Sequence, residues 1–402
     1  MLIRNELPEY RRPLTAQDAE ALRAEAAAEV EGFLELRENH KPTPLYSLGA
    51  LAKKLNVDGI YIKDESHRLH AGSFKALGSS YAIIRLVLEN ASSQLGRAVN
   101  VSELHTRSVR DIARQMVFGC ATTGNQGLAV AYGAHLVGAK AVVFVHANIS
   151  KERIAAIERW RAHVIRVDGP YEEALAEAAR ACARSGAILV SDLSGTGDEH
   201  AAKFIMQGYV PIISEAMRTI PNAPTHIFVQ AGIGVLAAAI TGHLATTLGA
   251  ERPTIIVVEP ERAACLYASA AKGNIHKIAG NAPSVMAMLE CFEPSHLAWR
   301  ILSRQADFFM IVKEDDAISA MNQLAKPMGN DPAIVAGESG GVGLAGLIRL
   351  AQDASLSSRI ELNSNSRILV VNTEGAMDLS RYNQIVGLSP LVVSAGLPCD
   401  GI

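Results

Sequence analysis

The stretch HIFVQAGIGVLAAAITGHL (226–244) decides the fold class, because it is typical of a buried strand that passes through a glycine turn into a helix. The strand part has the apolar centre expected in a parallel sheet that is covered on both faces. Gly232 and Gly234 allow a tight turn, and small residues of helical length follow. This unit predicts an α/β protein whose ligands bind where the strands end.

The same alternation continues along the chain. Further predicted strands are AVVFV (141–145), HVIRV (163–167), AILVSD (187–192), TIIVVEP (254–260), DFFMIV (307–312) and RILVVN (367–372). Ala-rich, charged segments that predict helices span 151–161, 171–185, 201–219, 235–249, 261–272, 314–326 and 341–353. A further surface helix is predicted in 15–39, with Thr15 or Asp18 near its start. We therefore expect mostly parallel, twisted sheets flanked by helices.

The length of 402 residues suits two domains better than one core. The polar stretch around 90–108 predicts a surface loop and a passage into a smaller domain, and LSSRIELNSNS (356–366) predicts another loop. We expect a small domain over 90–215 and a large domain made of 1–89 and 216–402.

Composition excludes several classes of protein. Thirty-eight basic and 41 acidic residues give a formal charge of −3, which supplies no electrostatic footprint for nucleic acid. No apolar run approaches the roughly 20 residues that span a bilayer. The N-terminus lacks the apolar core of a signal peptide, so a cytoplasmic location is expected.

Cysteine and histidine spacing gives no sign of a metal site. The five cysteines form no CxxC pair, and the 12 histidines show no paired ligand spacing. We expect buried free thiols and no transition-metal ion. Whether Cys265 and Cys291 meet is left open by the sequence.

Two further segments contain candidate catalytic or ligand-binding residues. In KDESHRLHAGSFKALGSSYA (63–82), Lys75 lies just inside a predicted helix, where apolar neighbours can favour a neutral amine and a Schiff base. The alternative is a surface lysine on an amphipathic helix. In FGCATTGNQGLAVAYGAHLVGA (118–139), the TTGNQG turn opens a helix whose backbone N–H groups favour a carboxylate, although an ordinary cap has the same pattern.

The glycine turn at 232–234 has two interpretations. It can hold a phosphate at a helix N-terminus. It also fits a GxGxxA dinucleotide fingerprint with Gly232, Gly234 and Ala237, and Glu259 stands where a ribose-binding acid would be. An NAD-dependent dehydrogenase is therefore a rival, but it leaves Lys75 and the TTGNQG turn unused. Pyridoxal phosphate would use all three segments.

The chain resembles the fold-type II pyridoxal-phosphate enzymes, the tryptophan synthase β/threonine dehydratase group, and within it the 2,3-diaminopropionate ammonia-lyases. The matching pieces run across most of the chain: KPTPLYSL (41–48), KDES (63–66), FKALG (74–78), TGNQG (123–127), KFIMQGY (203–209), THIFVQAGIG (225–234), VVEPERAAC (257–265), MGNDPAIVAGESGGVGL (328–344) and NTEG (372–375). The resemblance implies a cofactor in a cleft between two domains, a small amino-acid substrate and a homodimer.

The resemblance assigns cofactor contacts residue by residue. It implies that Lys75 carries pyridoxal phosphate and takes the α-proton, that Phe74 packs near the ring, and that Asn125 hydrogen-bonds the ring hydroxyl. Thr373 is the candidate partner of the pyridine nitrogen, where a neutral hydroxyl suits β-elimination. The expected phosphate-binding residues are Gly232, Ile233, Gly234 and Val235.

The expected substrate-binding residues match the family pattern only in part. The resemblance places Asp192 near the substrate, where its carboxylate can hold a distal ammonium group. The remaining expected substrate-binding residues are Thr122, Thr123, Gly124 and Gln126. Ammonia-lyases of this group carry an acid in this turn, TDGNHG, to which proton abstraction from the D-isomer is assigned. Here that position is Thr123, which cannot act as a base near neutral pH.

The segment after Asp192 also departs from the family pattern. Asp198, Glu199 or His200 could supply a replacement acid, or could simply begin a solvated helix. We therefore expect release of pyruvate and ammonia from 2,3-diaminopropionate, with the L-isomer preferred. The alternative within the same chemistry is a pyridoxal-phosphate-dependent dehydratase or β-lyase that acts on another β-substituted amino acid. A noncatalytic module that binds the cofactor or an amino acid is a third class.

Overall fold

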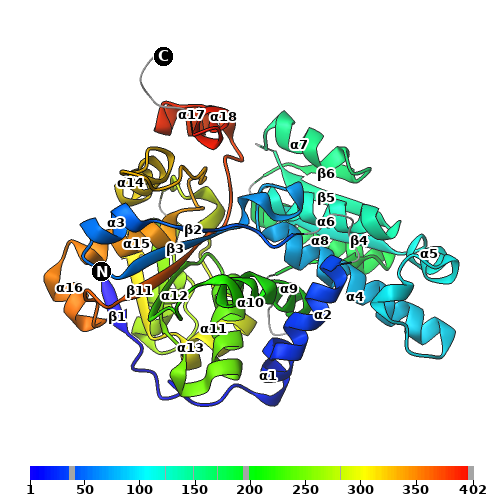
Figure 1. Cartoon of the computed structure of the whole chain (residues 1–402). Helices are drawn as coiled ribbons and strands as arrows, with labels where there is room; N and C mark the ends of the chain where they lie inside the picture. Colours follow the sequence, from blue (N-terminus) through cyan, green and yellow to red (C-terminus); the bar gives the residue numbers. More distant parts are fainter. Residues whose placement is uncertain are drawn as a thin grey trace. The chain divides into compact units, whose positions relative to one another are not determined.

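The computed structural model describes residues 1–35, 41–122, 124–147, 149–169, 171–192, 199–280 and 282–396. The chain divides into two compact units (Figure 1). Unit 1 comprises Met1–Arg23, Pro42–Ser73 and Ile212–Ile402, and unit 2 comprises Ala24–Lys41 and Phe74–Pro211. Unlike the expected division, this one assigns 24–41 and 74–89 to the smaller unit, because the long helix that begins at Lys75 packs on helices of that unit.

Unit 1 is built on a seven-stranded sheet in the order β1-β10-β9-β8-β11-β3-β2. Its strands are β1 (Leu2–Arg4), β2 (Leu45–Ser47), β3 (Gly59–Asp64), β8 (His226–Gln230), β9 (Thr254–Pro260), β10 (Phe308–Val312) and β11 (Arg367–Asn372). The five central strands are parallel, and the edge strands β1 and β2 are antiparallel to their neighbours. The α/β architecture with mostly parallel sheets is confirmed.

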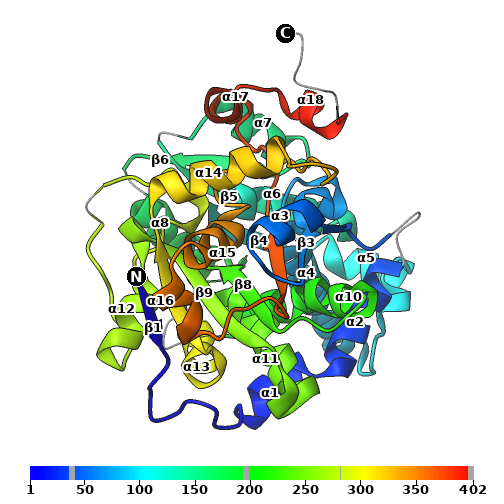
Figure 2. The same ribbon diagram turned by 60° about the vertical axis from the view of Figure 1, so that its left-hand side comes forward.

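Helices cover both faces of this sheet (Figure 2). The helices of unit 1 are α1 (Ala16–Leu22), α3 (Gly49–Lys54), α10 (Val210–Thr219), α11 (Val235–Leu248), α12 (Cys265–Lys272), α13 (His296–Gln305), α14 (Glu314–Ala325), α15 (Val342–Ala351), α16 (Ala354–Arg359), α17 (Leu379–Val386) and α18 (Pro390–Ser394). Phe228, Val258 and Met310 pack in one core with residues of α3, α14 and α15. Phe309 points the other way, toward Trp299 of α13. Strands buried on both faces explain the apolar runs in the sequence.

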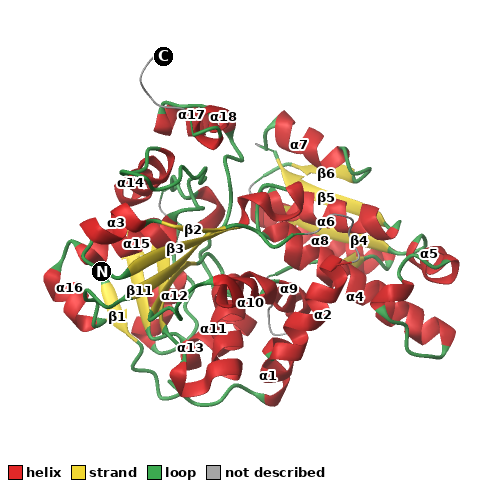
Figure 3. Cartoon of the chain, viewed as in Figure 1, coloured by secondary structure: helices red, strands yellow, loops and turns green. Residues whose placement is uncertain are grey.

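Unit 2 has its own parallel sheet in the order β6-β5-β4-β7. Strands β4, β5 and β6 lie side by side in Figure 3. Its strands are β4 (Val117–Thr122), β5 (Lys140–His146), β6 (His163–Val167) and β7 (Ile188–Leu189). Its helices are α2 (Ala24–Glu35), α4 (Lys75–Leu95), α5 (Arg107–Ala113), α6 (Asn125–Val137), α7 (Lys151–Glu158), α8 (Tyr171–Ser185) and α9 (His200–Gly208). Helix α8 packs against Ala121 and Phe144 on one face, and α6 meets Val143 on the other.

Close glycine contacts bind α4 to both of its neighbouring helices. A Cβ atom added to Gly133 of α6 would lie 2.9 Å from the Cα atom of Ser80 in α4. A Cβ atom on Gly208 of α9 would lie 2.7 Å from the Cα atom of Gly78. Only glycine permits backbones to approach this closely, so α6, α4 and α9 form one packed group that presents Lys75 at its edge.

Several expected elements differ in detail. The predicted 201–219 helix is divided into α9 and α10, and the N-terminal helix into α1 and α2. Thr15 caps α1 by accepting a hydrogen bond from the Asp18 backbone N–H. The predicted loops are wrong at their helical ends, since α4 continues to Leu95 and α16 covers Ala354–Arg359. Residues 90–95 keep the helix because Ala91 is buried, and Asp353 caps α16 through the backbone N–H groups of Ser355 and Leu356.

Four cysteines lie in the described part of the chain: Cys120, Cys182, Cys265 and Cys291. None of the four forms a disulfide bond among the described residues, and the first three are buried. Among the described residues, no helix combines the length and apolar character needed to cross a membrane. The same residues contain no group of three His, Cys, Asp or Glu side chains that could hold a metal ion.

Candidate active site

Lys75 is the first residue of α4 and pairs with a carboxylate. Its Nζ atom donates to Oδ2 of Asp192, which lies beyond β7 in the same unit. The two side chains are only 25% and 13% exposed, so their pairing is shielded from water. The structure therefore brings together two residues that the sequence separates by 117 positions. A shielded amine beside a carboxylate is suited to moving a proton.

An aromatic pair flanks this lysine. The Nζ atom of Lys75 lies 5.6 Å from the centroid of the Phe74 ring. The ring of Tyr209 packs on the Phe74 ring, with the two centroids 4.8 Å apart. The Phe74 ring thus supplies one of the apolar neighbours that the sequence predicts for the lysine amine.

The TTGNQG turn joins β4 to α6. The Oγ1 atom of Thr122 accepts hydrogen bonds from the backbone N–H groups of Gly124 and Gly127, at 2.8 and 2.9 Å. Thr122 is 1% exposed, so its hydroxyl shapes the turn. Gly124 has a φ of +152°, a conformation that favours glycine. Asn125 is the first residue of the helix.

Gln126 and the remaining turn residues complete this side of the site. Ser79 of α4 donates to the Oε1 atom of Gln126 at 3.2 Å, which fixes the amide on the helix that carries Lys75. The Nε2 donor of Gln126 is buried and has no hydrogen-bond partner among the described residues. Thr123 and Asp198 lie outside the described residues. His200 begins α9 and contacts Glu89 at 2.6 Å on the exposed surface, as expected of a solvated helix start.

In unit 1, the glycine turn leads from β8 into α11. Gly234 is the N-cap of α11, with a φ of +95° and no side chain that caps the helix. The next two residues, Val235 and Leu236, are buried, so these helix N–H groups lie where an anion would satisfy them. A Cβ atom on Gly232 would lie 2.9 Å from Sγ of Cys291, which explains the need for glycine there. The turn therefore fits a phosphate group.

Thr373 follows β11, and its hydroxyl is oriented by Gln230. The Nε2 atom of Gln230 lies 3.0 Å from Thr373 Oγ1, and the carbonyls of Ser339, Gly340 and Val371 share its two N–H groups. When Oγ1 accepts from Gln230, the hydroxyl proton of Thr373 is left to donate elsewhere, as a donor to a ring nitrogen requires. Gln230 was not predicted from sequence, although a buried polar residue at the end of an apolar strand is a signal that could have found it.

Glu259 has a structural task that the dehydrogenase interpretation did not foresee. Its carboxylate accepts hydrogen bonds from the backbone N–H groups of Leu266 and Tyr267, at 2.8 and 2.6 Å, at the start of α12. It is fully buried, and burial raises its pKa to about 8. This carboxylate is therefore used inside the protein and is not presented to a ribose.

A buried cluster of charges supports the segment that leads to Lys75. Glu215 of α10 accepts hydrogen bonds from Arg68 at 2.9 and 2.8 Å and from Lys63 at 2.5 Å. Arg68 also donates to Glu65, whose carboxylate accepts from Thr43. Burial lowers the pKa of Lys63; burial alone would raise the pKa of Glu215, but Arg68 and Lys63 hold it below its ordinary value. Two cations and two anions thus compensate one another inside unit 1.

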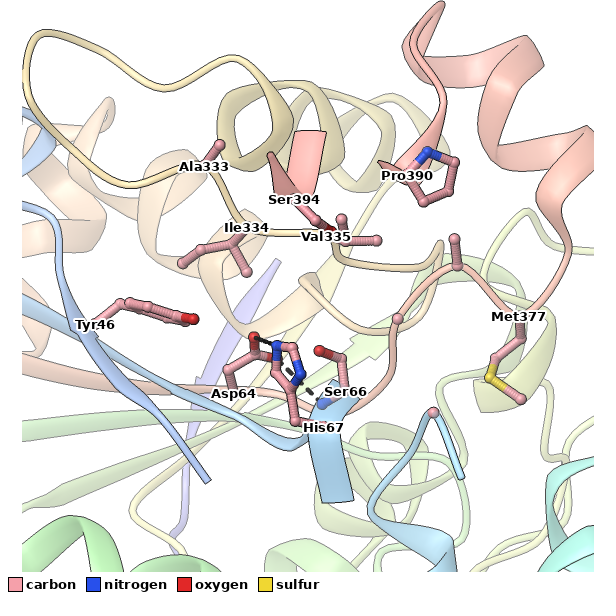
Figure 4. Close-up of a pocket in the computed structure, with 13 residues that line it drawn as sticks. Tyr46, Asp64, Ser66, His67, Ala333, Ile334, Val335, Met377, Pro390 and Ser394 are labelled. Carbon is pink, nitrogen blue, oxygen red and sulfur yellow. Dashed lines mark hydrogen bonds and ion pairs between the residues drawn. The ribbon is translucent and has the colours of Figure 1, made fainter. Parts of the chain in front are cut away.

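A separate pocket of about 290 Å³, with a mixed polar and apolar lining, lies at the ends of β3 and β11 (Figure 4). The Asp64 carboxylate accepts from Asn372 Nδ2 at 2.8 Å and from the Ser66 backbone N–H at 3.1 Å. His67 faces it at 3.4 Å, and the hydrogen bond to Asp64 raises the pKa of this histidine. The lining residues that the structure describes include none of the predicted site residues.

Comparisons with known proteins agree with this chemistry. A family model described as pyridoxal-phosphate dependent enzyme matches residues 36–374. The diaminopropionate ammonia-lyase of Escherichia coli (strain K12) is 34% identical over 380 residues, which cover 93% of this chain and 92% of that protein. The enzyme of the same name from Salmonella typhimurium is 33% identical over 368 residues, covering 89% and 91%.

Solved structures agree as well. The crystal structure of the Escherichia coli enzyme in complex with an aminoacrylate-PLP azomethine reaction intermediate superposes with a TM-score of 0.85. It is 31% identical and covers 96% of each chain. Maize serine racemase, at 19% identity and a TM-score of 0.71, shares the fold.

Proposed function

We propose that this chain, which belongs to the pyridoxal-phosphate-dependent enzymes and within them to the diaminopropionate ammonia-lyases, converts 2,3-diaminopropionate to pyruvate. The reaction consumes one water and releases both nitrogen atoms as ammonia. The observation that carries the proposal is the shielded Lys75–Asp192 pair on a chain that aligns with these ammonia-lyases over 92% of their length. A base and a carboxylate side by side suit a substrate with two amino groups.

Pyridoxal phosphate is the cofactor, and the two units offer groups that fit it. Bound to an amino group, it supplies an electron sink that lowers the barrier to removing the neighbouring proton. Backbone N–H groups of Gly232, Ile233, Gly234 and Val235 bind its phosphate. Thr373, oriented by Gln230, donates to the ring nitrogen, and Asn125 hydrogen-bonds the ring hydroxyl.

The protein's own side chains move the proton and orient the substrate. The Nζ atom of Lys75 accepts the α-proton, and Phe74 keeps water away from that amine. The Asp192 carboxylate binds the distal ammonium group of the substrate. The backbone at Gly124 and the Nε2 donor of Gln126 bind the substrate carboxylate, which is why a buried donor without a partner is tolerated there.

The L-isomer is the preferred substrate in this proposal. Lys75 is the base that this proposal assigns to the α-proton, and a single base serves one face of the α-carbon. Thr123 replaces the acid that would serve the other face. The same substitution favours a second candidate of the same chemistry, a dehydratase or β-lyase for another β-substituted amino acid.

Replacing Lys75 tests the proposal. We expect Lys75→Ala to lose pyruvate formation and the visible absorbance of the bound cofactor, while far-UV circular dichroism stays unchanged. Lys203→Ala is the matched control, since it removes another lysine of the same unit, one that forms an ion pair with Glu199 at 3.7 Å and has no part in the proposed reaction. An active Lys75→Ala variant, or a parent protein that never acquires the absorbance band, would contradict the proposal.

By likeness to the family, the proposal extends to a homodimer in the cytoplasm. Sedimentation of the purified protein as a monomer across micromolar concentrations would contradict the assembly. Fractionation of the source cells tests the location.

A further inference from the structure

The motif KFIMQGY (203–209) ends in a tyrosine to which the proposed reaction gives no task. Tyr209 directly follows α9 and is 1% exposed. Its hydroxyl is buried and has no hydrogen-bond partner among the residues that the structure describes. A buried hydroxyl without a partner is unfavourable, so its retention calls for a reason.

The hydroxyl end of Tyr209 lies against the first turn of α4. A Cβ atom added to Gly78 would lie 2.4 Å from Cε1 and 2.6 Å from Cζ of Tyr209, and Cζ carries the hydroxyl. Gly78 follows Lys75 by three positions, so both residues lie on the same face of the helix. The ring also packs on Phe74, whose ring lies 5.6 Å from the lysine nitrogen.

The charges around the phenol are those of the reacting pair. Burial raises the pKa of Tyr209; Lys75 lowers it and Asp192 raises it. The phenol therefore stays protonated at neutral pH and can donate a hydrogen bond. The Asp192 carboxylate, which is 13% exposed, accepts from Lys75 and acts electrostatically on the Tyr209 phenol, so it is the candidate acceptor for that hydroxyl.

We propose that Tyr209 is a positioning residue for Asp192, whose carboxylate takes the tyrosine hydroxyl as its donor when Lys75 leaves it during the reaction. The hydroxyl compensates a shielded carboxylate that has lost its ammonium partner, and it keeps one oxygen fixed while the other binds the distal ammonium of the substrate. This inference rests on the proposed function, because it assigns Asp192 to that ammonium group.

Tyr209→Phe, compared with Tyr382→Phe, tests the inference. Tyr382 of α17 is also fully buried with a hydroxyl that lacks a partner among the described residues, so it matches Tyr209 in burial and in the group that the substitution removes. It packs in a different cluster, with Met321, Ala325, Val386 and Val393 of unit 1. Without cofactor, when Lys75 pairs with Asp192, we expect both variants to melt at or above the temperature of the parent protein, since each loses an unpaired hydroxyl. We expect only Tyr209→Phe to lose about tenfold or more in kcat/KM for diaminopropionate.

Two further readouts separate positioning from packing. Serine has a neutral β-substituent, so its turnover should fall less in Tyr209→Phe than that of diaminopropionate. Without substrate, the pH titration of the cofactor absorbance should shift by about half a pH unit or more in Tyr209→Phe and stay unchanged in Tyr382→Phe.

A Tyr209→Phe variant with parental kcat/KM and an unshifted titration would overturn the inference, as would equal losses in both variants. A lower melting temperature for cofactor-free Tyr209→Phe would also overturn it, because the hydroxyl would then have a partner while Lys75 still pairs with Asp192. If the parent binds the cofactor but does not turn over diaminopropionate, the proposed function fails, while the titration still decides the role of Tyr209.

Discussion

Glu215→Gln should cause a large loss of stability, because it removes one of four compensating charges from the interior of unit 1. Glu215 is 2% exposed and holds Arg68 and Lys63 through hydrogen bonds of 2.5 to 2.9 Å. Glutamine keeps the shape and one oxygen acceptor. It leaves Lys63, Arg68 and Glu65 with one uncompensated positive charge.

The size of the loss follows from these distances. At 2.8 Å and an effective dielectric constant of about 20, each ion pair gains roughly 6 kcal/mol before desolvation. Desolvation offsets much of this gain, and removal of one partner from a buried pair typically costs about 3–5 kcal/mol. We expect the free energy of unfolding to be about 3–5 kcal/mol lower in Glu215→Gln than in the parent protein. Since domains have about 5–15 kcal/mol in total, the variant should still fold.

Urea unfolding at pH 7, followed by far-UV circular dichroism, measures this loss. Glu177→Gln is the matched control, because Glu177 pairs with Arg180 and Arg184 at the surface of unit 2 and should leave the urea midpoint unchanged. The pH dependence gives a second check. Burial already lowers the pKa of Lys63, and loss of Glu215 lowers it further. The unfolded chain then binds more protons than the folded one, so the variant should recover stability as the pH rises toward about 10.

A loss below about 1 kcal/mol would refute this reasoning, because it would place the cluster in the range of exposed ion pairs. A loss that does not diminish at higher pH would show that Lys63 is not the group left with the excess charge.

The remaining predictions concern backbone contacts and one buried acid. Gly78→Ala should destabilise the protein by about 1–3 kcal/mol, because the added Cβ atom would lie 2.4 Å from Tyr209. Gly32→Ala should stabilise α2 by about 0.5–1 kcal/mol, because nothing lies within 4 Å of the added Cβ atom. Equal effects of the two substitutions in urea unfolding would contradict this reasoning. Gly232→Ala should weaken cofactor binding about tenfold in fluorescence titrations, since its Cβ atom would meet Cys291; unchanged affinity would count against the phosphate turn. Burial raises the pKa of Glu259 to about 8, so the folded protein binds the extra proton and its stability should fall as the pH rises from about 4.5 to 8. Glu259→Gln should flatten that dependence, and an unchanged slope would show that the acid is ionised when folded.

The sequence predicts the parts of the fold that depend on apolar patterning. The central strands β8 to β11 were predicted because a parallel strand buried on both faces is apolar along its length. β3 and β4 were not predicted as strands, because each contains residues that interrupt the apolar pattern. β3 ends in Lys63 and Asp64, which are buried only because distant partners compensate them. β4 contains Gly119, which is needed because a Cβ atom there would lie 2.3 Å from Sγ of Cys182.

The residues of the candidate site also fall into those that local sequence predicts and those that it does not. Lys75 and the glycine turn follow from local patterns, and resemblance supplied Asp192 and Thr373. The ion pair of Lys75 with Asp192, the Gln230 bond to Thr373 and the position of Tyr209 join residues more than 100 positions apart. Local sequence patterns do not reveal contacts between residues so far apart in the chain. In its local sequence, Tyr209 looks the same as an ordinary core residue.

Initial rates with L- and D-2,3-diaminopropionate test the central claim most directly. We expect the L-isomer to yield one pyruvate and two ammonia per turnover. We expect kcat/KM for the D-isomer to be about 100-fold or more below that for the L-isomer, which is the usual contribution of a positioned base. Equal rates with the two isomers would contradict the single-base site at Lys75, and no pyruvate from the L-isomer by holoenzyme would contradict the proposed reaction.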